Sequence, residues 1–138
     1  MSTDAPSPSS QDLVISLSGI TRTYFKPDGT VLVEALKNID VDISRGEYVA
    51  IMGASGSGKS TMMNIIGALD QPTSGSCCIN GSDIASMSDE KLSMVRGRSI
   101  GFVFQAFNLI GALTVIENVE VPLFYQSIPR LDRQRRTV

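Results

Sequence analysis

From residue 13 onward the chain has short apolar runs, with Gly- and Pro-containing turns among them. Residues 13–17 and 31–33 are apolar runs that predict strands. Residues 39–43 alternate apolar and acidic positions, which predicts a strand with one solvated face. Residues 48–52 form a short apolar run, which is typical of a buried parallel strand. The first third of the chain is therefore predicted to be rich in β-structure.

The spacing changes after residue 58. Met62, Ile65, Ile66 and Leu69 recur on one face of a helix of 3.6 residues per turn, which predicts an amphipathic helix. The polar segment 70–75 contains Pro and Gly and ends that helix. The middle of the chain is therefore predicted to run from a strand through a loop into a helix.

The second half returns to alternating strands and helices. Residues 77–79 predict a strand that leads into the Asn-Gly turn at 80–81, a strong hairpin signal. Ser88 is a predicted N-cap for a short helix that ends near Arg96. Residues 100–104 predict another strand. This order of elements indicates an α/β fold with an additional antiparallel part.

The last clear helix is predicted by a capping box at Thr114 and Glu117. Pro122 is expected to kink or end this helix, because proline lacks the N–H that the helix interior uses. The segment after it is basic. We expect a solvated helix face there rather than an anion-binding site. The residues concerned are Arg130, Arg133, Arg135 and Arg136.

Residues 53–61 have the sequence Gly-Ala-Ser-Gly-Ser-Gly-Lys-Ser-Thr, with two glycines five apart before Lys-Ser. Glycines let a backbone curl tightly, so that its N–H groups at a helix start can approach a polyphosphate. In this pattern Lys59 reaches the β- and γ-phosphates, and the Ser60 hydroxyl holds Mg²⁺. A Gly/Ser-rich turn between two core elements is the alternative. The predicted strand and helix on either side favour the phosphate loop.

Composition limits the class of protein. The chain has 138 residues and a net charge of −2, which fits one domain and gives no general attraction to nucleic acid. It contains no histidine, so no His-based catalysis or metal site lies within it. Its two cysteines, Cys77 and Cys78, are adjacent and would face opposite sides of a strand. Ordinary packing is therefore favoured over a disulfide or a metal site.

The chain resembles the ATP-binding subunit of ABC transporters, in particular the macrolide-export and lipoprotein-release group (MacB/LolD-like). The resemblance runs from about Leu13 to the C-terminus and goes beyond the phosphate loop. Residues 64–70 and 72–75 resemble that group's first helix and its exit. Residues 101–105 resemble its Q-loop, and residues 117–123 resemble the start of its helical subdomain.

The resemblance implies roles for individual residues. Tyr24 would stack on adenine, and the less favoured alternative is a hairpin packing residue. Gln105 would contact Mg²⁺ or the attacking water and so join Lys59 as a catalytic residue. An ordinary exposed glutamine is the alternative, and the Phe104-Gln105 context favours the functional role. Thr61 would donate its backbone N–H to the α-phosphate. The full nucleotide-binding set comprises Tyr24, Gly53, Ala54, Ser55, Gly56, Ser57, Gly58, Lys59, Ser60 and Thr61, with Ser60 and Gln105 as Mg²⁺ ligands.

The implied fold is a P-loop NTPase core of ABC ATPase type, with an antiparallel β annex and the start of the helical subdomain. Residues 1–11, rich in Ser and Pro, are expected to be a disordered lead. Residues 12–138 would be the N-terminal part of an ATP-binding domain. The implied cofactors are ATP and Mg²⁺. The implied partners are a second ATP-binding subunit, forming a homodimer, and a transmembrane permease subunit or domain, with the chain cytoplasmic and peripheral to the inner face of the cell membrane.

Parts that the family uses for hydrolysis are not among these 138 residues. The family places Asp-Glu after four apolar residues, yet the one Asp-Glu pair here, at 89–90, follows a polar stretch. The Leu-Ser-Gly-Gly-Gln signature is absent, and residues 17–19 begin like it but precede the phosphate loop. We therefore interpret the sequence as truncated and expect weak ATP binding without hydrolysis. In such a chain the run 48–52 would expose an unpaired apolar edge.

Two other functions are compatible with a phosphate loop. Another P-loop enzyme, a GTPase or a small-molecule kinase, would use the same phosphate loop. A GTPase also needs an Asn-Lys-x-Asp guanine reader and an Asp-x-x-Gly loop, and the sequence contains neither. A non-catalytic nucleotide-binding fragment remains the second alternative.

Overall fold

The computed structural model describes residues 12–104 and 106–137. The chain divides into two compact units, Met1–Leu92 and Ser93–Val138, and the boundary falls within helix α2 (Asp89–Ser99). Each unit is described by itself. The predicted disordered lead at 1–11 and the predicted site residue Gln105 lie outside the described residues.

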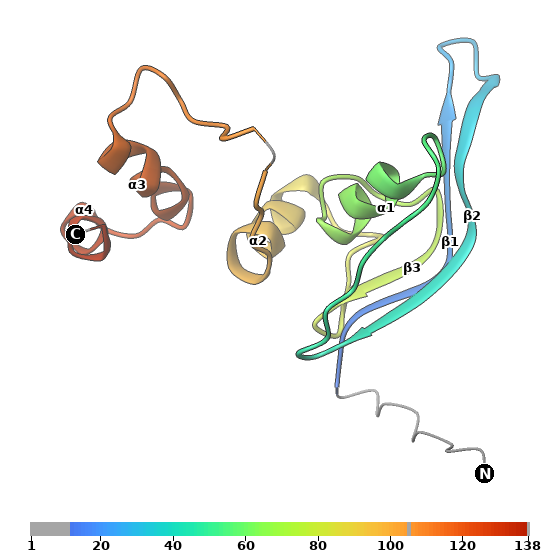
Figure 1. Ribbon diagram of the computed structural model, residues 1–138, viewed down its shortest axis with the longest axis horizontal. Helices are drawn as coiled ribbons and strands as arrows, with labels where there is room; N and C mark the ends of the chain where they lie inside the picture. Colours follow the sequence, from blue (N-terminus) through green and yellow to red (C-terminus); the bar gives the residue numbers. More distant parts are fainter. Residues whose placement is uncertain (1–11, 105, 138) are drawn as a thin grey trace. The chain divides into compact units, whose positions relative to one another are not determined.

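The first unit is built on a four-stranded antiparallel sheet in the order β2-β1-β3-β4 (Figure 1). The strands are β1 (Leu13–Phe25), β2 (Val31–Ser44), β3 (Ser74–Ile79) and β4 (Ser82–Asp83). The predicted runs 31–33 and 39–43 belong to one long strand rather than two. The pairing of β1 with β2 contains several register shifts, which let a long ribbon bend without breaking.

Two local predictions for this sheet are confirmed. Ile39, Val41 and Ile43 are half-buried, whereas Asp40 and Asp42 between them are exposed, as the alternation predicted. The Asn-Gly turn at 80–81 joins β3 to β4 in an antiparallel hairpin, with φ of 48° and 76° at its two residues. Positive φ at both positions is what a tight hairpin turn requires.

Helix α1 (Lys59–Ile66) lies along one face of the sheet and contacts β2 and β3 (Figure 1). The apolar core fills the space between them. Its buried side chains are Leu17, Ile20, Leu36, Ile65, Ala68, Cys77, Ile79, Ile84 and Leu92. Burial, with smaller contributions from Cys78 and Asp83, raises the pKa of the Cys77 thiol to about 11. Cys77 is therefore a neutral packing residue, in agreement with the sequence interpretation.

The backbone of β3 passes very close to that of β1 at Gly75. A Cβ atom added to Gly75 would lie 2.5 Å from the carbonyl oxygen of Gly19 and 2.6 Å from that of Ser18. Gly75 also has a φ of +94°, which other residues rarely adopt. The close approach lies at the register shift of the β1–β3 pairing, between Ser18 and Thr21, just before the buried Cys77.

The predicted strand at 48–52 is wrong, and the structure has no strand there. Tyr48 is 95% exposed and Met52 is 86% exposed. The predicted strand at 100–104 is wrong as well, and Val103 is fully exposed. A parallel strand forms only beside another strand, and no described segment makes a ladder with either run. The run 48–52 is largely exposed, but because it is not a strand it does not form the unpaired sheet edge that was expected.

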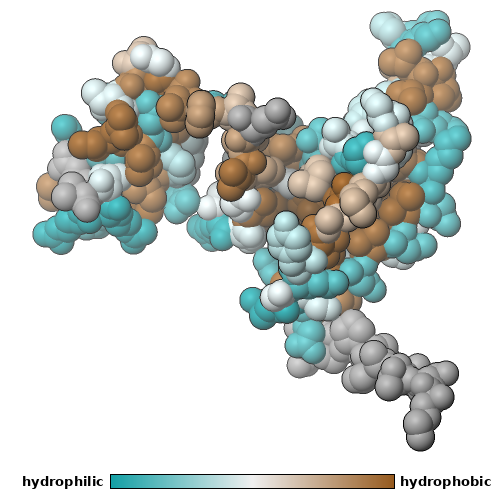
Figure 2. All heavy atoms as spheres, viewed as in Figure 1, coloured by the Kyte–Doolittle hydropathy of each residue, from teal (hydrophilic) through white to brown (hydrophobic). Residues whose placement is uncertain are grey.

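The second unit contains the end of α2, helix α3 (Val115–Tyr125) and helix α4 (Arg130–Arg136). The predicted capping box of α3 is confirmed, because Thr114 Oγ1 accepts from the N–H of Glu117 and Glu117 Oε2 accepts from the N–H of Thr114. Pro122 does not end α3, which continues to Tyr125. Much of this unit's surface is apolar (Figure 2).

Helix α4 carries the basic cluster. Arg130, Arg135 and Arg136 are exposed, as predicted for a solvated face. Arg133 differs, because its guanidinium lies 5.5 Å from the centre of the Phe124 ring and its Nη1 donates to the carbonyl of Ile128. None of the helices in the described ranges 12–104 and 106–137 is both long and apolar enough to cross a bilayer.

Candidate phosphate-binding site

The loop at 53–58 leads directly into α1. Gly53, Gly56 and Gly58 have φ values of 153°, 79° and 87°, which together give the tight curl that the sequence predicted. Gly58 is the N-cap of α1 and has no side chain to cap it. The first turn of any helix leaves backbone N–H groups without an intrahelical partner, and these groups favour an anion.

Gly58 is required by space as well as by conformation. A Cβ atom at this position would lie 2.5 Å from the carbonyl oxygen of Ala35 and 2.9 Å from Cδ2 of Leu36. The end of the loop is therefore pressed against β2, which fixes where α1 begins. At the other end of the loop, a Cβ atom at Gly53 would lie 2.7 Å from Oγ of Ser57.

The ammonium group of Lys59 lies over the loop. Its Nζ donates to the carbonyl oxygen of Gly53 at 2.9 Å and to that of Ala54 at 2.7 Å. The charge is thus placed beside the curl of the backbone, where a phosphate would meet both the ammonium and the N–H groups. The loop and its lysine together have the chemistry of a polyanion site.

A cavity of about 340 Å³ opens beside the loop. This volume falls in the range of small-molecule sites. Strands β1 and β2 contribute Tyr24, Val33 and Ala35 to its lining, so it combines an aromatic ring and apolar side chains with the polar loop. The remaining lining residues are Ser55, Gly56, Gly58, Lys59, Ser60 and Thr61.

The structure thus brings seven of the predicted nucleotide-binding residues to one cavity: Tyr24, Ser55, Gly56, Gly58, Lys59, Ser60 and Thr61. Gly53, Ala54 and Ser57 belong to the loop but do not line that cavity. Gln105 is outside the described residues. The nucleotide-binding roles of all these residues remain predictions.

Other residues near the cavity were not predicted. Val33 and Ala35 line it from β2, which also contacts α1. Arg22 and Asp70 lie beside Tyr24 and bind each other at 2.7 Å. The sequence could have predicted that Arg22 lies beside Tyr24, because residues two apart on a strand share a face. It gave no indication that Asp70 lies there, apart from the place of Asp70 in the polar segment that ends α1.

Comparison with known proteins assigns the chain to a family. A sequence profile described as ABC transporter matches residues 36–138. The chain therefore belongs to the ABC transporter family. The predicted fold class is confirmed, because solved ABC cassettes of the P-loop NTPase type superimpose on this ABC transporter chain.

Individual relatives sharpen the assignment. The chain is 51% identical over 123 residues to YknY of Bacillus subtilis, an uncharacterized ABC transporter ATP-binding protein, covering 89% of this chain and 53% of YknY. It is 48% identical to the macrolide export ATP-binding/permease protein MacB of Brucella abortus, covering 89% of this chain and 19% of MacB. The predicted resemblance to the macrolide-export group is therefore confirmed.

The match to a solved structure covers the same share of the chain as the match to YknY. The dimeric post-hydrolysis state of the ATP-binding cassette MJ0796, bound to ADP and Pi, matches with a TM-score of 0.77 and 44% identity. The match covers 89% of this chain and 53% of the cassette. This ABC transporter chain thus spans about half the length of the ATP-binding proteins that it matches.

Proposed function

We propose that the chain binds MgATP through the loop at 53–61, as a nucleotide-binding part of an ABC transporter. The observation that carries the proposal is a single cavity lined by Lys59, by the start of α1 and by the ring of Tyr24. A nucleotide has the matching parts, a polyanionic tail and a flat base. The cassette MJ0796, which binds ADP and Pi, supports this choice of ligand.

Each predicted residue has a physical role in this proposal. Lys59 neutralises the β- and γ-phosphates, and the N–H groups of the loop and of Thr61 donate to phosphate oxygens. The hydroxyls of Ser55 and Ser57 lie in the same loop and offer further donors. The Ser60 hydroxyl, together with Gln105, would hold Mg²⁺, which when bound neutralises phosphate charge. Tyr24 offers a ring face to the base.

Titration of the protein with a fluorescent ATP analogue tests the phosphate cradle. Lys59→Ala should weaken binding by at least about tenfold, because a charge-assisted hydrogen bond to phosphate is lost. Lys91→Ala removes the same charge from an exposed position on α2 and serves as the control. Equal affinity of the Lys59 variant and the parent would contradict the proposed site.

We further propose that two copies of the complete subunit enclose ATP and drive a permease, with the chain at the cytoplasmic face of the cell membrane. The dimeric state of MJ0796 supports the homodimer, and the combined ATP-binding/permease protein MacB supports the membrane partner. Lys59 and Gln105 would then take part in hydrolysis in the complete subunit. Another P-loop function, such as a GTPase or kinase, has no relative among these in its support.

Hydrolysis by these 138 residues alone should stay at background. No Asp-Glu pair in the sequence follows an apolar run, so the carboxylates that would orient Mg²⁺ and polarise water are missing from it. Phosphate release from ATP, measured for the parent and for Lys59→Ala, should not differ. Release that depends on Lys59 would show that essential hydrolytic groups are present after all.

A further inference from the structure

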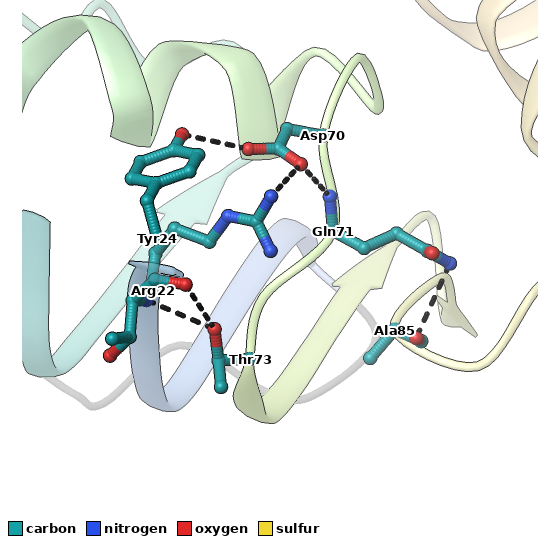
Figure 3. A network of polar contacts seen from close by, with 7 residues as sticks. Arg22, Tyr24, Asp70, Gln71, Thr73 and Ala85 are labelled. Atoms are coloured by element: carbon teal, nitrogen blue, oxygen red, sulfur yellow. Dashed lines mark hydrogen bonds and ion pairs between the residues drawn. The ribbon is translucent and has the colours of Figure 1, made fainter. Parts of the chain in front are cut away.

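Arg22, Tyr24 and Asp70 form a closed network beside the cavity (Figure 3). The Tyr24 hydroxyl donates to Oδ2 of Asp70 at 2.9 Å, and Nη2 of Arg22 donates to Oδ1 of the same carboxylate at 2.7 Å. The Arg22 guanidinium also lies 4.6 Å from the centre of the Tyr24 ring, within cation–π distance. The ring is therefore held both at its hydroxyl and across its face.

The network joins two segments that are far apart in the sequence. Arg22 and Tyr24 lie on one side of β1, whereas Asp70 follows α1. The carboxylate is itself held in place, because its Oδ1 also accepts from the N–H of Gln71 at 2.9 Å (Figure 3). Nearby, Thr73 Oγ1 accepts from the N–H of Thr23 at 3.0 Å. The Asp70 carboxylate is therefore held in place, and its hydrogen bond to the Tyr24 hydroxyl fixes the position of the Tyr24 ring.

The charged pair is sheltered. The side chains of Arg22 and Asp70 are each only 23% exposed, so their attraction is screened less than that of a surface pair. The Nε atom of Arg22 is buried, and within residues 12–104 and 106–137 it has no hydrogen-bond partner. The guanidinium lies against the Tyr24 ring although its Nε atom makes no hydrogen bond to any described residue there. The ion pair with Asp70 does not by itself require this position, whereas the contact with the ring explains it.

Tyr24 lines the cavity, whereas neither Arg22 nor Asp70 does. The two charged residues therefore approach the ring from outside the space that a ligand would enter. A tyrosine that is already immobilised loses less side-chain freedom when a flat ligand stacks on it, and this preorganisation increases affinity.

We propose that Arg22 and Asp70 are positioning residues for Tyr24, which fix the ring plane against which the base of a bound nucleotide stacks. This inference rests on the proposed nucleotide site and deepens it. The rival explanation is that the network only ties β1 to the segment after α1. The two differ in one respect: positioning of the ring matters for a ligand with a base and not for one without.

The test compares ATP with inorganic tripolyphosphate, each as a competitor of a fluorescent ATP analogue. Asp70→Asn keeps the shape of the side chain but removes its charge and one of its two acceptor oxygens, so it can no longer accept from Arg22 and Gln71 on one side and from the Tyr24 hydroxyl on the other. It should weaken ATP binding about threefold to tenfold, the range for one lost hydrogen bond, and leave tripolyphosphate binding unchanged. Asp89→Asn is the matched control, since it removes the same charge from an exposed position and should change neither affinity.

Two further variants complete the experiment. Tyr24→Phe removes the same hydrogen bond from its other end, so the double variant with Asp70→Asn should bind ATP no more weakly than Asp70→Asn alone. Arg22→Lys retains the charge but not the flat guanidinium, and should weaken ATP binding and leave tripolyphosphate binding unchanged.

Equal losses for ATP and tripolyphosphate in Asp70→Asn would overturn the inference in favour of the structural tie. No loss for ATP would overturn it too. Failure of the proposed function has a different signature, because neither ligand would then bind the parent protein in a way that depends on Lys59.

Discussion

The two units of this chain are stabilised in different ways. All nine buried apolar side chains found among the described residues lie within the first unit, between the antiparallel sheet and the segments that cover it. In the second unit α3 has no buried residue, and Val115 and Tyr125 are 80% and 81% exposed. The start of α3 is defined by a local feature, the capping box at Thr114 and Glu117. The comparison shows that local signals can specify a helix without a core around it.

The largest expected effect contrasts two identical substitutions. Ile65→Ala removes a fully buried side chain from the first unit and should lower the free energy of unfolding by about 2–5 kcal/mol. Ile116→Ala removes the same atoms from a side chain that is 53% exposed in α3, and should change the free energy of unfolding by less than about 1 kcal/mol. Urea unfolding followed by circular dichroism measures both. Similar losses of unfolding free energy for the two variants would contradict the conclusion that only the first unit depends on a buried apolar core.

A smaller effect concerns backbone packing within the first unit. Gly75→Ala introduces a Cβ atom 2.5 Å from the Gly19 carbonyl at a φ of +94°, and should cost about 1–3 kcal/mol. Gly81→Ala has a similar φ of +76° but open space around the new atom, so it reports the conformational strain alone. The difference in urea midpoint between the two variants measures the close approach. If Gly81→Ala were the more destabilising, the contact between β1 and β3 would not be the constraint described here.

The smallest effect is the pH dependence of the second unit. The backbone N–H of Thr114, and then its hydroxyl, bind the Glu117 carboxylate and lower the pKa of that group below its usual 4.5. A lowered pKa means that the cap contributes fully above pH 4.5 and is lost as pH falls through the folded-state pKa. The NMR shifts of the first turn of α3 should therefore titrate in acid below pH 4.5.

The variant Glu117→Gln provides the control for this titration. Its amide still accepts from the Thr114 N–H but carries no titrating charge, so the acid transition in the first turn should vanish. An unchanged transition would assign it to another carboxyl group.

The sequence predicted the features that neighbouring residues determine. The capping box at Thr114, the Asn-Gly hairpin and the start of α1 at the phosphate loop depend on a few adjacent positions, and all three are present. The strands at 48–52 and 100–104 were predicted wrongly because an apolar run indicates a tendency to be buried and does not supply a pairing partner. Asp70 was missed for a related reason, since its contact with Tyr24 spans 46 residues.

The two hydrogen bonds of the Lys59 ammonium have a consequence for any ligand of the loop. An incoming phosphate does not meet a free cation, but must replace two carbonyl oxygens of the same chain. The measured affinity for phosphate therefore reflects the exchange of two Lys59–carbonyl hydrogen bonds for hydrogen bonds to phosphate. A substitution that weakens the hydrogen bonds to these carbonyls and leaves the ammonium in place would increase the affinity for phosphate.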